Sequence, residues 1–533
     1  MKNLKYINYL AAAFTLLAVS CVDFDKLNEN PTQSPNMDPN LQIPTIELLQ
    51  SNQTDNWHRF LIYPGGFMNQ WTQDWATIEY GGKGQKSDAY FSLYWDMYYS
   101  GIGGTPGIIK EVVDLTERTR DIPEYTNIHA MARILKVENF LRLTDIYGDI
   151  PYFDAAKAYY SGIFRPKYDT QEMIFDDFFK ELKEAAASLS ANYPKATADL
   201  YYSGDVDLWR KFANSLRLRI AMRLIKVDPA RAKVEVQSAV NDGVFTSNSD
   251  ICYLKHENVK ESVGASAGNG LANILLKDKS STFRLTRELI GTMEDLGDPR
   301  LLYYGSSYLE DNVRTEITPQ LYAYYGTYKE LVNPAQIFNY DMVTGAKSAI
   351  TINVNGVETE VPWLLQLMQP SKVITNYGSP YIHLSYAEVE FLQAEAVVKG
   401  FIAGNAQDHF KKGMEAAVNQ WSLFDVKVPA DAAANYSAKN PLQSGKELEQ
   451  IGTQLWILNV LDPVETWSNW RRMEQPNIQF YNNYPTVNQS NGKTPRRIPY
   501  PVSEQKNNYD EWKTAVDRLG GTDDWLSRMW WDK

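Results

Sequence analysis

The chain has 533 residues, a formal net charge of -12 and an isoelectric point near 5.1, so it lacks the excess positive charge that nucleic-acid binding requires. Its length allows two to four ordinary domains or one large domain with an embedded lobe, and its mean hydropathy of -0.42 indicates a soluble, globular body. Two cysteines, Cys21 and Cys252, and five scattered histidines offer no zinc cluster of the usual spacing, so we expect neither a metal nor another cofactor.

The N-terminus predicts an export signal over residues 1–20. Lys2 and Lys5 precede an apolar run, residues 9–19, that is too short to span a bilayer. Cys21 follows small residues at the end of this run, an arrangement that resembles the bacterial lipobox, in which the thiol is acylated and becomes the first residue of the mature chain. The alternative is an ordinary export signal that happens to contain a cysteine.

Residues 21–40 follow as a lipidated N-terminus and an extended tether that contains Pro31, Pro35 and Pro39. Asp23 and Asp25 resemble the acidic signal that sends some lipoproteins to the cell surface. Acyl chains on Cys21 would hold the protein at a membrane without any membrane-spanning segment.

The first helix of the body is expected over residues 41–56. The next stretch, residues 57–100, mixes tryptophan and tyrosine with glycine, a combination that interrupts helices and places aromatic rings on loops. Trp95 and Tyr98 lie in a more regular part of this stretch and are expected to be packing residues. The remainder is predicted to form the first half of a binding surface.

Apolar residues recur at spacings of three and four in regions long enough for two antiparallel helices. Asp169, with Glu172 three residues later, is the expected N-cap of one helix, and Asp228 before Pro229 is the expected N-cap of another. The helical pairs are predicted around residues 129–190, 207–243, 383–421 and 447–473.

The third pair has the strongest pattern. Its small residues, among them Gly413, let two helices approach closely, and Phe410 fills the space between them, as in a tetratricopeptide repeat. One such pair cannot bury its apolar face alone, so a stack of pairs is required. Charged side chains on the predicted helices are assigned to solvated or salt-bridged faces; these are Arg217, Arg219, Arg223, Glu388, Glu390 and Glu395.

Residues 248–369 lose the helical periodicity and are rich in turns and tyrosines. Residues 349–354 favour a β-strand. We expect this segment to complete the irregular binding lobe. Because Cys21 would be acylated, Cys252 is expected to be a buried free thiol.

Five short stretches together resemble the SusD/RagB family of nutrient-binding outer-membrane lipoproteins. They are LTDIYGDIPYF at residues 143–153, LSYAEVEFLQAEA at 384–396, ETWSNWRR at 465–472, RRIPYP at 496–501 and WWDK at 530–533. They occur in the family's order and span nearly the whole mature chain, and DFDKLNENP at residues 23–31 resembles one branch of the family.

The resemblance implies a mainly α fold over residues 41–533, with a tetratricopeptide-like scaffold of four helical pairs and an irregular ligand-binding lobe containing short strands. It also implies a lipid-anchored protein at the outer membrane, facing the cell exterior. Its partner would be a SusC-like TonB-dependent barrel, over which it would sit as a lid. The ligand would be a nutrient, usually an oligosaccharide and less often a peptide.

A neutral oligosaccharide offers C–H faces and hydroxyl rims, so its site needs flat rings and polar side chains. Family ligand contacts come from the early loop region and the central lobe, which correspond here to residues 71–80 and 303–328. The expected stacking rings are Trp71, Trp75, Tyr80, Tyr322, Tyr324 and Tyr325, with Gln73 and Asp74 as polar partners.

Two other function classes compete with this hypothesis. A surface glycoside hydrolase would need two carboxylates across a cleft, for which Glu388 and Glu395 are candidates on one helix, but a solvated helix face explains both more simply. The chain also lacks GxSxG and phosphate-loop motifs, so no enzymatic activity is expected. An adaptor could instead bind a peptide or protein segment in its helical groove, as tetratricopeptide arrays do.

Overall fold

The computed structural model describes residues 37–51, 67–76, 84–102, 105–259, 267–277, 283–309, 314–331, 349–478 and 488–533. Helices dominate these residues and the strands are short, which confirms the predicted mainly α fold. The predicted signal peptide, the acylation site Cys21 and the candidate ring Tyr80 lie outside the described residues.

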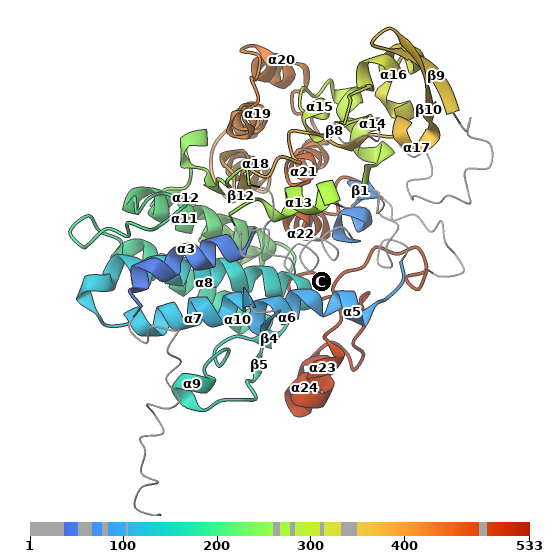
Figure 1. The fold of residues 1–533 in the computed structure, drawn as a ribbon. Helices are drawn as coiled ribbons and strands as arrows, with labels where there is room; N and C mark the ends of the chain where they lie inside the picture. The colour runs from blue at the N-terminus through green and yellow to red at the C-terminus, as the bar shows by residue number, and fades with distance from the viewer. Residues whose placement is uncertain are drawn as a thin grey trace, which may run out of the picture.

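The N-terminal half of the scaffold is built from long helices that lie side by side (Figure 1). α8 (Thr126–Tyr147) packs against both α7 (Ile108–Thr119) and α10 (Gln171–Ser188). α11 (Val206–Arg223) packs against α12 (Pro229–Asp242), and α3 (Pro39–Leu49) crosses α7 and α8. The first two predicted helical pairs are therefore present.

The other two pairs follow later in the chain. α18 (Tyr386–Val398) packs against α19 (Ala406–Asn419), and α21 (Glu447–Leu458) packs against α22 (Pro463–Met473). A Cβ at Gly413 would lie 2.6 Å from a ring atom of Phe391, so glycine is what allows α18 and α19 to approach this closely. Phe391 in turn contacts Phe410 with ring centroids 5.8 Å apart, as the repeat pattern predicts.

Local caps explain where the helices begin. Asp228 accepts a hydrogen bond from the backbone nitrogen of Arg231, as predicted for the start of α12. The predicted N-cap of α10 is wrong by one residue: Thr170 is the cap, and its side chain accepts from Met173. Asp169 instead accepts from the backbone nitrogens of Tyr152 and Phe153, which ties the preceding turn together.

The lobe occupies the upper right of Figure 1 and consists of short helices and one hairpin. The predicted strand is β9 (Ala349–Val354), which pairs with β10 (Val357–Pro362) in antiparallel register. Asn355 and Gly356 both have positive φ, as a two-residue hairpin turn requires. The helices of the lobe are α13 (Gly270–Lys277), α14 (Arg287–Leu296), α15 (Leu301–Tyr304), α16 (Thr318–Tyr325), η4 (Tyr328–Leu331) and α17 (Trp363–Gln366).

Two-stranded ribbons join segments that are distant in sequence. These are β1 (Trp75–Ala76) with β7 (Arg284–Leu285), β6 (Cys252–Leu254) with β12 (Tyr381–Leu384), β8 (Gly305–Ser306) with β11 (Gln369–Pro370), β4 (Ile150–Pro151) with β5 (Tyr168–Asp169), and β2 (Gly101–Ile102) with β3 (Thr105–Pro106). Short helices complete the described chain: α5 (Asp88–Phe91), α6 (Leu93–Tyr99), η2 (Pro123–Tyr125), α9 (Ala158–Ser161), η3 (Asn248–Asp250), η5 (Gln420–Phe424), α20 (Ala432–Lys439), α23 (Val502–Asn507) and α24 (Tyr509–Arg518).

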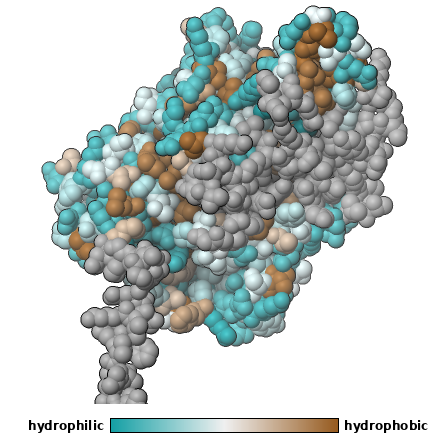
Figure 2. Space-filling view, in the orientation of Figure 1, coloured by the Kyte–Doolittle hydropathy of each residue, from teal (hydrophilic) through white to brown (hydrophobic). Residues whose placement is uncertain are grey.

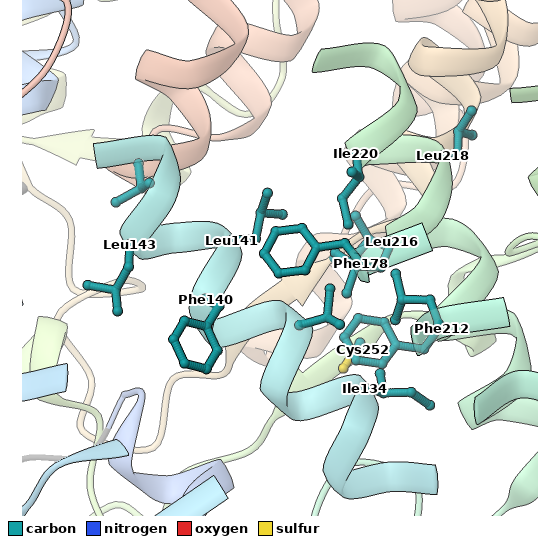
Figure 3. Close-up of a cluster of buried hydrophobic side chains, with 14 of the residues drawn as sticks. Ile134, Phe140, Leu141, Leu143, Phe178, Phe212, Leu216, Leu218, Ile220 and Cys252 are labelled. Atoms are coloured by element: carbon teal, nitrogen blue, oxygen red, sulfur yellow. The ribbon is translucent and has the colours of Figure 1, made fainter. Parts of the chain in front are cut away.

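The buried apolar side chains form two clusters, one in the scaffold and one in the lobe. Figure 3 shows Ile134, Phe178 and Phe212 of the scaffold cluster gathered with Cys252 between helices. Cys252 is buried and unpaired, which confirms the predicted free thiol. Trp95 and Tyr98 belong to the scaffold cluster, as predicted. The lobe cluster includes Trp421 and Trp456 from the scaffold, so the two parts share one interface.

The expectation that charged side chains of the stacked helices are solvated is wrong for most of them. Arg219 of α11 and Glu388 of α18 form a buried pair with two bonds of 2.7 and 2.8 Å. Glu395 likewise accepts from buried Arg472 at 2.6 Å. The physical reason is that a helix inside a stack is covered on more than one side, so its charged residues must find partners in the interior.

The other predicted surface charges follow the same pattern. Arg223 contacts Glu465 at 2.6 Å, and Arg217 contacts Asp242 at 2.7 Å; both arginines are buried. Glu390 is also buried and bonds to His409. The salt-bridged alternative for the arginines is thus confirmed, and the anion-site hypothesis gains no support.

Candidate ligand-binding surface

The exposed aromatic residues of the lobe are carried by α16, whose sequence TPQLYAYY places one apolar residue inside and tyrosines outside. Leu321 is fully buried and fixes the helix against the lobe core. Tyr322 is 39% exposed and Tyr324 is 47% exposed. Because each helical residue turns by about 100°, these two rings lie on opposite flanks of α16 rather than on one continuous platform. Gly326, with φ of 76°, then ends the helix in the left-handed conformation.

Tyr322 forms the first of two ring pairs. Its ring centroid lies 4.4 Å from that of Tyr328, with a tilt of 33° between the planes. Glu294 of α14 accepts hydrogen bonds from Thr327 at 2.7 Å and from the backbone nitrogen of Tyr328 at 2.9 Å, which fixes the turn that carries the second ring. Burial raises the pKa of Tyr328, so its hydroxyl is neutral at physiological pH and can both donate and accept.

Tyr324 and Tyr325 form the second pair, with centroids 4.8 Å apart and nearly perpendicular planes. The hydroxyl of Tyr325 donates to Oε1 of Gln366 at 2.6 Å, and Gln366 donates in turn to the carbonyl of Val361 at 2.9 Å. Tyr325 is therefore held in place as a support, while Tyr324 presents the freer ring. Figure 2 shows hydrophobic residues gathered on this upper right part of the molecule, where Figure 1 places α16, β9 and β10.

The early aromatic segment differs from the prediction. Trp71 is fully buried, with ring centroids 5.2 Å from Trp467 and 6.2 Å from Trp525. Trp75 is 2% exposed and contacts Phe283 of the lobe core. The prediction that these two rings stand exposed on loops is wrong, because partners far away in sequence cover them. Neither ring offers a face to an external ligand in this structure.

The predicted polar partners in this segment are also internal. Asp74 is fully buried and accepts from Asn69 at 3.0 Å and Thr72 at 3.2 Å, and desolvation by burial raises the pKa of its carboxyl well above the usual value. Gln73 is buried beside it, and its carbonyl accepts from Thr286 at 2.5 Å. Together they join the early segment to the lobe rather than face solvent.

An internal cavity of about 50 Å³ lies between scaffold and lobe, lined among others by Arg219, Tyr304, His383 and Trp421. This volume has room for a few water molecules and is too small for a sugar ring. Ligand binding by the described residues would therefore take place on an open surface rather than in this cavity.

The catalytic alternative relied on Glu388 and Glu395. Both carboxylates are buried and bonded to arginines, so they do not face each other across a solvent-filled cleft. Within the described ranges, no group of three His, Cys, Asp or Glu side chains is placed to hold a metal ion. None of the helices in the described part of the chain is sufficiently long and apolar to cross a membrane.

Sequence reasoning placed three of the described residues of this surface correctly on the lobe, Tyr322, Tyr324 and Tyr325, but it missed how they are paired. Tyr328 was noted only as one of many lobe tyrosines, and Gln366 was not noted at all. Nothing in the sequence links Gln366 to Tyr325, because 41 residues separate them.

Comparisons with known proteins agree with this architecture. Residues 40–501 match the SusD-like family model described as "Starch-binding associating with outer membrane". A solved "chitin-binding protein" is 30% identical with a TM-score of 0.75, and the alignment covers 93% of this chain and all of that one. "Bacteroidetes AC2a SusD-like" is 28% identical with a TM-score of 0.82 over the same shares.

A chitin-binding SusD homologue from Flavobacterium johnsoniae is 23% identical with a TM-score of 0.68, covering 92% of this chain and 97% of that one. No curated protein matches the chain.

Proposed function

The chain belongs to the SusD-like family, and from this premise we propose that it binds an oligosaccharide at the cell surface and passes it unchanged to a SusC-like TonB-dependent transporter in the outer membrane. The observation that supports the ligand class is the group of tyrosines on α16, where Tyr322 and Tyr324 combine exposed rings with hydroxyl groups. Such rings can stack on the C–H face of a sugar and bond to its rim.

The two ring pairs suggest how an extended ligand would be held. Tyr322 with Tyr328 forms one contact area and Tyr324, supported by Tyr325, forms another on the other flank of α16. One monosaccharide could contact only one area, so an oligosaccharide is expected to bind more tightly than its monomer. Open sites of this kind bind weakly, with Kd in the micromolar to millimolar range, about -4 to -8 kcal/mol.

Chito-oligosaccharides are the first ligands to test, because one similar structure, 30% identical, is described as a chitin-binding protein. Starch-type oligosaccharides come next, because the family description names starch. A peptide panel tests the alternative ligand class that the family resemblance leaves open.

Attachment to the membrane belongs to the same proposal. Cys21 is the expected acylation site, and Asp23 and Asp25 are expected to direct the protein to the outer face of the outer membrane. The scaffold helices would contact the SusC-like barrel, over which the protein would act as a lid.

The test is isothermal titration calorimetry of the protein against chito-oligosaccharides, malto-oligosaccharides and peptides, each compared with its monomer. We expect saturable binding to at least one oligosaccharide, with weaker binding to its monomer. Chromatography of the ligand after long incubation should show no cleavage products. Binding to peptides alone, or the appearance of cleavage products, would contradict the proposal. Co-purification of a large barrel protein from outer membranes tests the partner.

A further inference from the structure

A surface segment far from α16 carries the two most exposed large hydrophobic side chains among the described residues. We call residues 157–167, which include the single-turn helix α9, the α9 loop. Tyr159 is 90% exposed and Phe164 is 82% exposed. Figure 1 shows α9 standing away from the helical layers at the lower edge of the molecule. Nothing in the proposed ligand site explains why these rings face water.

The charges of the α9 loop accompany its rings. Arg165 and Lys167 are exposed, and neither has an ion-pair partner among the described residues. Lys157 contacts Glu117 at 3.8 Å, so its charge is partly compensated. Exposed aromatic rings beside basic side chains are the combination that suits a lipid surface, where the rings enter the boundary between head groups and acyl chains and the cations meet anionic head groups.

The position of the α9 loop is fixed relative to the beginning of the described chain. The hydroxyl of Tyr160 donates to Oδ1 of Asp114 at 2.5 Å, and the other oxygen of Asp114 accepts from Gln42 at 3.0 Å. Arg118 donates to Gln42 at 3.1 Å and to the carbonyl of Met37. A continuous set of hydrogen bonds therefore joins the α9 loop to Met37, the first described residue.

Met37 lies only 16 residues after the expected acylation site Cys21. Even fully extended, 16 residues span at most about 55 Å, and a flexible chain of this length spans about 22 Å on average. The end of the body that carries the α9 loop is thus the end that a lipid on Cys21 would keep near the bilayer. We propose that the α9 loop contacts the lipid surface through Tyr159 and Phe164 and sets the orientation of the body on the membrane, an inference that rests on the proposed lipid attachment.

The test places a spin label on the α9 loop of the full, lipid-anchored chain in vesicles of phosphatidylcholine with phosphatidylglycerol. Ser161→Cys leaves both rings in place, and Cys252 is buried, so the label reacts at position 161. The matched control is Val234→Cys on α12, which is exposed at 62%. On vesicles, the label at position 161 should gain oxygen collisions and lose collisions with a water-soluble nickel chelate, whereas the label at 234 should not change.

A second variant tests the rings themselves. Tyr159→Ser with Phe164→Ser, in the Ser161→Cys background, should abolish the change at position 161 while the protein still sediments with the vesicles through its lipid. Equal exposure of positions 161 and 234 to the nickel chelate in vesicle-bound protein would overturn the inference and leave the lipid anchor intact. Persistence of the signal without the two rings would also overturn it. Loss of sedimentation in the unsubstituted chain would reject the anchor and this inference together, and glycan titration tests the ligand proposal separately.

Discussion

Glu388→Ala is expected to destabilise the scaffold strongly, because it removes one partner of a buried charge pair. Arg219 and Glu388 are 6% and 1% exposed at their side chains and share two bonds of 2.7 and 2.8 Å. Breaking a buried pair on one side costs about 3–5 kcal/mol. Glu465, 3.6 Å from Arg219, and the carbonyl of His383, which accepts from Arg219 at 3.0 Å, would compensate in part. We therefore expect the lower figure, about 3 kcal/mol.

A loss of this size is a large fraction of the about 5–15 kcal/mol that stabilises a typical protein. The assay is urea denaturation followed by tryptophan fluorescence, with circular dichroism to confirm that the variant is folded at zero urea. Asp517→Ala is the matched control, because Asp517 pairs with Lys513 on the surface of α24 and should cost less than about 1 kcal/mol.

The double variant Arg219→Met with Glu388→Leu separates the lost charge from lost packing. It removes both charges and should be less destabilised than Glu388→Ala alone, because no unpaired guanidinium is left in the interior. If Glu388→Ala lost no more stability than Asp517→Ala, the claim that buried ion pairs connect the stacked helices would be refuted.

Gly413→Ala should cost about 1 kcal/mol in the same urea titration, because overpacking against Phe391 by about 1–3 kcal/mol exceeds the about 1 kcal/mol gained in helix propensity; an unchanged or higher midpoint would contradict this. Burial lowers the pKa of His256 to about 4, so the unfolded chain binds a proton that the folded chain does not, and stability should fall from pH 6.5 to pH 4 by up to about 3 kcal/mol more than in His256→Gln; identical pH profiles would refute the assignment. Burial also raises the pKa of the Cys252 thiol well above its usual value, so a maleimide should modify it only after unfolding, and rapid modification of the native protein, located by mass spectrometry, would show that the site opens.

The scaffold could be predicted from sequence because local rules and the fold agree there. Asp228 before Pro229 caps α12, and the spacing around Gly413 and Phe410 requires two closely packed helices. The strand β9 was equally local, since alternating Ile and Val favour it and Asn355 with Gly356 closes the hairpin.

Predictions that depended on distant partners failed. Glu388 was assigned to a solvated face because one helix alone cannot show that Arg219, 169 residues away, lies opposite it. Trp71 followed a local rule for aromatic residues near glycines, but Trp467 and Trp525 cover it. The burial of a ring is a property of the tertiary structure, and the sequence around the ring does not determine it.

The central claim is that the tyrosines of α16 bind an oligosaccharide, and the most direct measurement is calorimetric titration of Tyr322→Ala and Tyr324→Ala with the oligosaccharide that the unsubstituted protein binds best. Each variant should lose about 1 kcal/mol of binding free energy, about a fivefold increase in Kd. Tyr509→Ala is the matched control, because Tyr509 is 55% exposed on α24. The account predicts unchanged affinity for Tyr509→Ala and weaker binding for both α16 variants; equal affinity in all three would contradict it.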